Sequence, residues 1–370
     1  MNYEISIFLI ALITSITCSI VGVFLVIRKM SMMTDAISHT ILLGIVIAYI
    51  FVKDLQSPLL FIGATTMGLV TVYLIELLVK TRKINEDAAT GVTFPLLFSI
   101  AVILISLDFR DVHLDIDAVI LGKLEFSALN KLIIGNFILG PKNLWVMSII
   151  LLINLFFIIT FYKELKIVSF DSALASILGI SPIIIHYVLM SLVSITAVSA
   201  FEAVGSILVI SMMIGPTMTS LLISKNLCHT IIYSVIFASL NCIMGYSVAF
   251  ILDVRISSVI SIMTLITFLI VFIFAPKGMI KTIINKRIQR NDFNLMTFLT
   301  HIHNHQNTQN ALNEISIENA QIALNWNKNF FDKFYKKAYK LGLIYVNDDM
   351  IILTTKGIEH IDYMNKVYSR

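Results

Sequence analysis

The sequence predicts an all-α polytopic membrane protein of about nine transmembrane helices, followed by a small α+β soluble domain. Of 370 residues, 58% are hydrophobic and only 14% are charged, and the mean hydropathy is +0.90. Soluble domains carry about 45–50% apolar and about 25% charged residues, so this composition argues against a purely cytosolic enzyme and excludes a disordered chain. Residues 1–276 hold 29 charged side chains and residues 277–370 hold 21. We therefore place the transmembrane domain at 1–280 and the soluble domain at 281–370.

Nine apolar stretches are long enough to cross the hydrocarbon core, which takes about 20 residues. They are 4–27, 34–52, 58–79, 91–107, 145–162, 183–201, 203–224, 231–252 and 256–275. Only Glu202 separates the sixth from the seventh. The stretch 108–144 mixes charges with short apolar runs and is interpreted as an external loop that carries an interfacial or re-entrant helix.

The positions of Lys and Arg predict the orientation, because these residues concentrate on the cytoplasmic side. If the N-terminus is outside, the inner segments up to Arg290 carry 13 Lys and Arg residues and the outer segments carry 6. We therefore expect the soluble domain to lie in the cytoplasm.

Asp35 and His39 lie inside a predicted span, where an acidic side chain costs about 2.5–3.5 kcal/mol on insertion scales. Being four residues apart, they share one face of a helix. A carboxylate oxygen and an imidazole nitrogen suit a borderline divalent cation. The alternative is an ion pair that holds two helices together, and the spacing alone leaves both interpretations open.

The same region carries a family resemblance. The run from Arg28 to Gly44, which contains Asp35-Ala36-Ile37-Ser38-His39, resembles the signature of the membrane permease subunits of ABC-type manganese, zinc and iron importers. Further similar segments follow in the family's order: 86–94, 163–171 with Ala175 and 178–180, 204–209 with Pro216, and 275–278. The resemblance implies a multi-pass protein of the bacterial cytoplasmic membrane. It also implies that Asp35 and His39 line the path of the metal, which is the transported substrate and not a permanent cofactor.

A second segment is interpreted as the contact with an ATPase. After the basic turn at Lys163 and Lys166, either Asp171 or Ser169 can cap a short helix with an apolar stripe of Phe170, Leu174 and Ile177. Such a helix either docks into a groove of a soluble partner or lies on lipid headgroups. The family resemblance favours docking onto an ATPase subunit. It assigns this role to Ser169, Phe170, Asp171, Ala175 and Gly179.

The resemblance also implies the remaining partners. The chain lacks the G-x-x-x-x-G-K-[ST] motif that binds nucleotide phosphates, so ATP hydrolysis falls to a separate ATP-binding cassette subunit and the chain itself is a transport subunit rather than an enzyme. We also expect a second permease chain, identical or homologous, an extracytoplasmic metal-binding protein and membrane lipid.

The soluble domain has the order helix, helix, helix, hairpin, helix. The predicted helices are 292–304, 316–325, 327–341 and 358–367, and the strands are 343–346 and 350–354. This order resembles the winged helix of metal-dependent repressors of the diphtheria toxin repressor type. The middle helix has no Lys or Arg, so we expect protein contact or regulation and not nucleic-acid binding. The histidines His301, His303 and His305 form either a metal sensor or part of a polar surface.

The function predicted from these observations is that of a permease subunit for Mn²⁺, Zn²⁺ or Fe²⁺. Two other classes stay open. A secondary transporter or channel would move metal without an ATPase, and a membrane-tethered regulator would act through its soluble domain.

Overall fold

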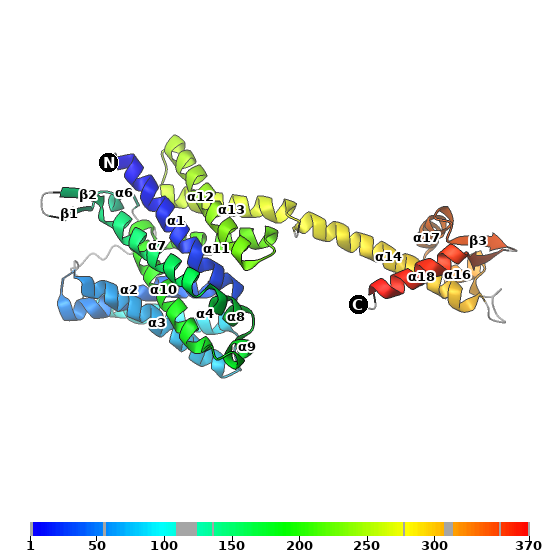
Figure 1. Cartoon of the computed structure of the whole chain (residues 1–370), viewed down its shortest axis with the longest axis horizontal. Helices are drawn as coiled ribbons and strands as arrows, with labels where there is room; N and C mark the ends of the chain where they lie inside the picture. Colours follow the sequence, from blue (N-terminus) through cyan, green and yellow to red (C-terminus); the bar gives the residue numbers. More distant parts are fainter. Residues whose placement is uncertain are drawn as a thin grey trace. The chain divides into compact units, whose positions relative to one another are not determined.

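The computed structural model describes residues 3–54, 57–108, 124–134, 137–276, 278–306, 314–347 and 349–368. The chain folds as two compact units, unit 1 (Met1–Gly278) and unit 2 (Met279–Arg370) (Figure 1).

Unit 1 is a bundle of long apolar helices. Within the described ranges, nine helices are long and apolar enough to cross a membrane, so the prediction of about nine spans is confirmed. They are α1 (Tyr3–Ile27), α2 (Met32–Val52), α3 (Pro58–Lys80), α4 (Glu86–Asp108), α7 (Lys142–Thr160), α10 (Pro182–Val204), α11 (Ser206–Ile223), α12 (Leu227–Leu252) and α13 (Ile256–Phe274).

Short elements join these helices. Between α4 and α7 lie the one-turn helix α6 (Leu124–Ser127) and an antiparallel hairpin of β1 (Lys131–Ile134) and β2 (Phe137–Pro141). The rest of the predicted external loop, 109–123, lies outside the described residues. Between α7 and α10 lie the two short helices α8 (Tyr162–Phe170) and α9 (Ser172–Ile177).

The break between the sixth and seventh spans corrects one sequence expectation. The chain does not leave the helix at Glu202 but at Gly205, which has φ +88° and ψ +161°. Glycine lacks a Cβ and adopts this positive φ without steric cost, whereas Glu202 continues the helix. The helix therefore ends three residues later than the charge pattern suggests.

Helix α1 lies at the centre of unit 1. It packs against α7, α10, α11 and α12, and most of its side chains are buried. Helices α2, α3 and α4 pack against one another, and α10 contacts both α2 and α3. At the α2–α3 crossing, a Cβ on Gly44 would lie 2.2 Å from the carbonyl oxygen of Gly63. Glycine at this position thus permits the close helix approach that is common in membrane bundles.

Buried polar side chains pair across the helices of unit 1. Three of the bonds are from Thr71 to Thr40 (2.7 Å), from Asn154 to Thr196 (2.8 Å) and from Thr267 to Asn241 (2.7 Å). In lipid no water is available to these groups, so each bond helps to fix which helices are neighbours.

Unit 2 is built from four helices and one hairpin. They are α14 (Met279–His305), α16 (Ile317–Ala323), α17 (Lys328–Lys340), β3 (Ile344–Asn347), β4 (Met350–Leu353) and α18 (Thr355–Tyr368). The strands are antiparallel with Ile344 opposite Leu353. The predicted element order is present, but α14 begins 13 residues before the predicted 292. The earlier start reflects the absence of Gly and Pro between Met279 and Asn291.

The core of unit 2 contains a cluster of aromatic rings among its aliphatic side chains. Phe298, Phe331 and Phe334 are almost completely buried, and Trp326 stacks within 6.4 Å of Phe298 and 5.5 Å of Phe334. These rings join α14 to α17 and so hold the unit together.

Replacing Phe334 by Ala is expected to destabilise unit 2 by about 3–5 kcal/mol, because it leaves a large cavity in this core. Limited proteolysis of the full chain should then cleave unit 2 rapidly and leave unit 1 intact. Replacing the exposed Tyr339 by Ala is the matched control. Equal protease resistance of the two variants would contradict the assigned core.

Candidate functional site

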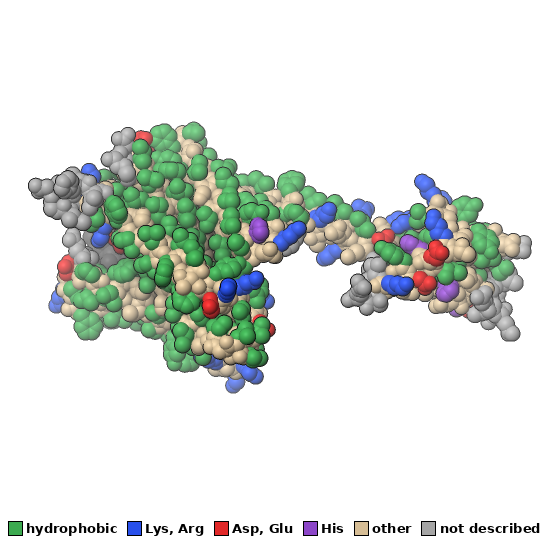
Figure 2. Space-filling view, viewed as in Figure 1, with side chains coloured by type: hydrophobic (Ala, Val, Ile, Leu, Met, Phe, Trp, Pro, Cys, Tyr) green, Lys and Arg blue, Asp and Glu red, His purple; other side chains and the backbone are tan. Residues whose placement is uncertain are grey.

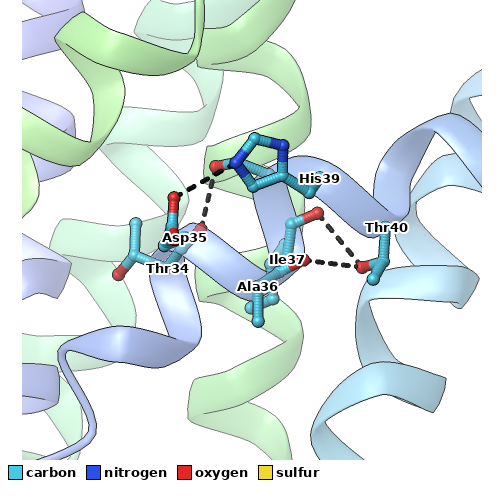
Figure 3. A network of polar contacts seen from close by, with 7 residues as sticks. Thr34, Asp35, Ala36, Ile37, His39 and Thr40 are labelled. Carbon is cyan, nitrogen blue, oxygen red and sulfur yellow. Dashed lines mark hydrogen bonds and ion pairs between the residues drawn. The ribbon is translucent and has the colours of Figure 1, made fainter. Parts of the chain in front are cut away.

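Asp35 and His39 lie on one side of α2, in its first two turns. Oδ1 of Asp35 is 3.4 Å from Nε2 of His39. Figure 3 shows the two side chains next to each other, with Thr40 pointing to another side of the helix. Asp35 lies in the first turn of α2, where the helix dipole favours a negative charge. The carboxylate and the imidazole thus face each other within one helix, whereas the alternative from the sequence was an ion pair that joins two helices.

Two aromatic rings of α4 surround the imidazole. Phe94 stacks on His39 with ring centroids 5.5 Å apart, and Phe98 meets it edge-on at 5.8 Å. The pair nevertheless stays accessible, since the side chains of His39 and Asp35 are 31% and 36% exposed. An accessible carboxylate and imidazole on an apolar helix can accept a passing cation.

Helix α2 is bonded to α3 on a different side from that of Asp35 and His39. Thr71 of α3 donates to the hydroxyl of Thr40, which itself donates to the carbonyl oxygen of Ala36. This bond orients the turn that carries Asp35 and His39.

The site brings together two side chains of metal-binding type, one carboxylate and one imidazole. Among the described residues there is no group of three or more His, Cys, Asp or Glu side chains able to hold a metal ion. Structural zinc sites use four protein ligands and hold the metal tightly. A pair that leaves most of the coordination sphere to water suits an ion that binds and leaves again.

The predicted docking helix is α9, and its ends are well defined. Asp171, with φ −150° and ψ +94°, accepts a hydrogen bond from the amide of Leu174 (2.9 Å). Of the two capping residues that the sequence allows, the structure thus selects Asp171. At the other end Gly179 has φ +80°, and the amide of Ile180 donates to the carbonyl of Ala175. This glycine conformation commonly terminates helices.

The apolar stripe of this segment faces solvent. Phe170 is 66% exposed and Ile177 is 82% exposed, with Leu174 also exposed, whereas Ala175 is fully buried. Ala175 thus attaches α9 to unit 1. The large apolar side chains point away from it, as expected of a helix that contacts another surface.

Replacing Asp171 by Ala is expected to cost α9 about 1 kcal/mol, because the capping bond to Leu174 is lost. Amide hydrogen exchange over residues 172–177 should accelerate by about fivefold, the population change that this energy gives. Asp171→Asn keeps a capping oxygen and is the control. Equal acceleration in both variants would show that the cap is not what holds the helix.

Arg28 connects the predicted docking segment, residues 169–179, to the membrane helices, and sequence analysis did not identify this contact. Its Nε donates to Oγ of Ser169 (3.1 Å), and its Nη1 donates to Nδ1 of His186 (3.3 Å). Nε2 of His186 in turn contacts the carboxylate of Glu76, which also accepts a bond from Tyr187 (2.7 Å). The network joins the end of α1 with α3, α8 and α10.

The charge of Arg28 persists despite its surroundings. Burial lowers the pKa of Arg28 to about 10, so the guanidinium is still protonated at neutral pH. Since Arg28 is seven residues before Asp35, the bond to Ser169 links the docking segment to the chain just before the candidate metal ligands.

The three histidines near the end of α14 separate into two groups. The rings of His301 and His305 lie 4.7 Å apart, while His303 is exposed. His305 contacts the carboxylate of Glu314, and Nε2 of His301 lies 3.2 Å from the carbonyl oxygen of Glu314. These contacts join the end of α14 to Glu314.

Comparison with known proteins gives consistent matches. Residues 2–275 match the ABC 3 transport family. The chain is 36% identical over 355 residues to the zinc transport system membrane protein TroD of Treponema pallidum (strain Nichols), covering 95% of each protein. It is 39% identical over 276 residues to the manganese transport system membrane protein MntD of Bacillus subtilis (strain 168), covering 75% of this chain and 93% of that protein.

A solved structure shows the same architecture. PsaBC from Streptococcus pneumoniae, in complex with Fab, matches with a TM-score of 0.62 and 28% identity, over 75% of this chain and 93% of that one. The family match covers nearly all of unit 1, and the similarity to TroD extends into unit 2. The chain therefore belongs to the ABC 3 transport family of membrane transport proteins.

Proposed function

We propose that the chain is the permease subunit of an ABC-type importer that moves a divalent metal ion, manganese or zinc, across the membrane. The observation that carries the proposal is the Asp35–His39 pair, accessible on one side of α2 in a chain of this family. The relatives TroD and MntD are named for zinc and manganese transport. Ferrous iron is a third candidate, because oxygen and nitrogen ligands accept it as well.

The proposed role of Asp35 and His39 is to replace part of the hydration shell of the ion during its passage. The carboxylate supplies charge and an oxygen ligand, and the imidazole supplies a nitrogen ligand. With Phe94 and Phe98 beside it, His39 keeps one ring orientation. Weak binding by two ligands allows release, which transport requires.

The energy source in this proposal is a separate ATP-binding cassette subunit. In this proposal the ATPase subunit docks onto the exposed residues of α9 and the segment around it. The residues assigned to this contact are Ser169, Phe170, Asp171, Ala175 and Gly179. Closure of two ATPase subunits moves the docking segments of two permease chains, and Arg28 passes this movement to the start of α2 through its bond to Ser169. A metal-binding protein on the other side of the membrane delivers the ion.

Unit 2 is proposed to be a cytoplasmic, winged-helix-like domain used for protein contact or regulation. Support comes from the excess of Lys and Arg in the inner segments and from the order of helices and hairpin in unit 2. Helix α16 carries Glu318 and no Lys or Arg, which disfavours a role as a DNA recognition helix.

The test is competitive uptake of labelled manganese, zinc and iron in cells that express the chain or lack it. Loss of manganese or zinc uptake on deletion, with restoration by the wild-type gene, is the expected result. Unchanged uptake of all three metals would refute the assignment. Uptake that persists when the ATPase subunits of the cell that serve metal import are inactivated would instead indicate a secondary transporter or channel.

A further inference from the structure

The first half of α14 presents an apolar face that stays exposed among the described residues of unit 2. Five residues of this face are 44–52% exposed: Met279, Ile280, Ile283, Ile284 and Ile288. The buried residues of α14 begin only at Leu295. Exposed isoleucines at i, i+4 and i+8 on one helix form a stripe that favours an apolar environment.

Lys281 and Lys286 border this stripe on its two sides, and Arg287 and Arg290 lie within it towards its C-terminal end. Lys281, Lys286, Arg287 and Arg290 lie on the same twelve residues, and the first acidic residue after Phe274 is Asp292. Figure 2 shows hydrophobic and basic side chains together along α14. An amphipathic helix with this positive charge fits a surface that has an apolar interior and a negatively charged outer layer.

The position of α14 in the chain places it beside such a surface. The last membrane helix ends at Phe274, and a turn closed by the bond from the Gly278 amide to the Ala275 carbonyl (2.8 Å) leads into α14. Five extended residues span at most about 17 Å. Met279 therefore starts within reach of the lipid headgroups, whichever side of the membrane they belong to.

We propose that residues 279–290 of α14 bind anionic phospholipid, with the isoleucine stripe at the acyl boundary and the Lys and Arg side chains on the headgroup phosphates. Basic amphipathic helices next to a membrane span bind in this way. The contact anchors the beginning of unit 2 to the membrane surface.

A second copy of the chain fits this face less well. Paired helices need apolar residues at every third and fourth position, and Arg287 interrupts the series that begins at Ile280 and Ile284. Two copies side by side would also bring eight positive charges together without an acidic partner before Asp292. Like charges at such a contact repel.

The test uses the full chain in vesicles of phosphatidylcholine with or without phosphatidylglycerol, with brominated acyl chains as quencher. Ile284→Trp places a fluorophore in the stripe, and Asn285→Trp is the matched control on the opposite side; the unsubstituted chain gives the background of Trp145 and Trp326. In phosphatidylglycerol vesicles, quenching of I284W should exceed that of N285W by about threefold or more. It should fall to the control value in about 1 M salt, which shortens the screening length to about 3 Å.

A charge variant separates lipid binding from simple proximity. Replacing Lys281, Lys286, Arg287 and Arg290 by Gln in the I284W chain should remove the dependence on phosphatidylglycerol. Three results would overturn the proposal. They are equal quenching of I284W and N285W, quenching that does not respond to anionic lipid, and protection of I284W from both the lipid quencher and a soluble one, which would mean that protein covers the face.

Discussion

Replacing Asp35 by Asn or His39 by Ala is expected to lower metal uptake by more than about 100-fold. The removal of a group that only supports a metal ligand already costs 10–100-fold in affinity or activity, and here one of the two proposed ligands is lost. Asp35→Asn keeps the size of the side chain but removes the charge that faces the cation. The measurement is initial-rate uptake of labelled manganese and zinc, with the amount of chain in the membrane quantified for each variant.

Ser38→Ala is the matched control for both substitutions. Ser38 lies between the two ligands in the chain, and its hydroxyl bonds to the carbonyl of Thr34 within the same helix. Loss of this hydroxyl should change metal uptake by less than about twofold, because a bond from a serine to a carbonyl of its own helix contributes little to stability. Normal uptake in Asp35→Asn and His39→Ala would remove these residues from the metal path.

Leu174→Asp is expected to abolish binding of the ATPase subunit. An apolar side chain at the centre of a docking helix contributes at least about 2 kcal/mol, which is about 30-fold in affinity, and a carboxylate buried in its place adds a desolvation cost. Because Leu174 is exposed in this chain, the substitution leaves unit 1 folded. Co-purification of the ATPase and metal-dependent ATP hydrolysis are the measurements.

Ser176→Asp introduces the same charge on the same helix, away from the stripe. Ser176 is exposed and its hydroxyl donates to the carbonyl of Ser172 within the same helix, so this variant should keep the ATPase. If both variants retained it, the docking helix would lie elsewhere. If both lost it, the added negative charge, and not the loss of the apolar stripe, would account for the effect.

Much of the membrane architecture is predictable because lipid imposes a simple rule on sequence. Runs of about 20 apolar residues must be helices, since no water satisfies the backbone there. The end of α10 was predicted wrongly because a charge can snorkel from within a helix, whereas the positive φ of Gly205 ends it. The early start of α14 was not predicted from the sequence. The mixed basic and apolar residues 279–291 are equally typical of a linker between two domains.

The candidate site is predictable only in its local part. A spacing of four places Asp35 and His39 together within one helix, and the Asp171 cap likewise depends on neighbours in sequence. Other contacts of the site join residues that are 55 to 158 positions apart in the sequence. They are those of His39 with Phe94 and Phe98, and those of Arg28 with Ser169 and His186. Such contacts depend on how the helices pack, which one sequence does not specify.

The most direct test of the account is whether His39 touches the ion. The full complex, purified with its ATPase and loaded with Mn²⁺, can be examined by electron spin echo spectroscopy for hyperfine coupling to an imidazole nitrogen. The account predicts this coupling in the wild type and its loss in His39→Ala, with no change in Ser38→Ala. An identical nitrogen signal in His39→Ala, or a wild-type spectrum of fully hydrated Mn²⁺, would contradict it.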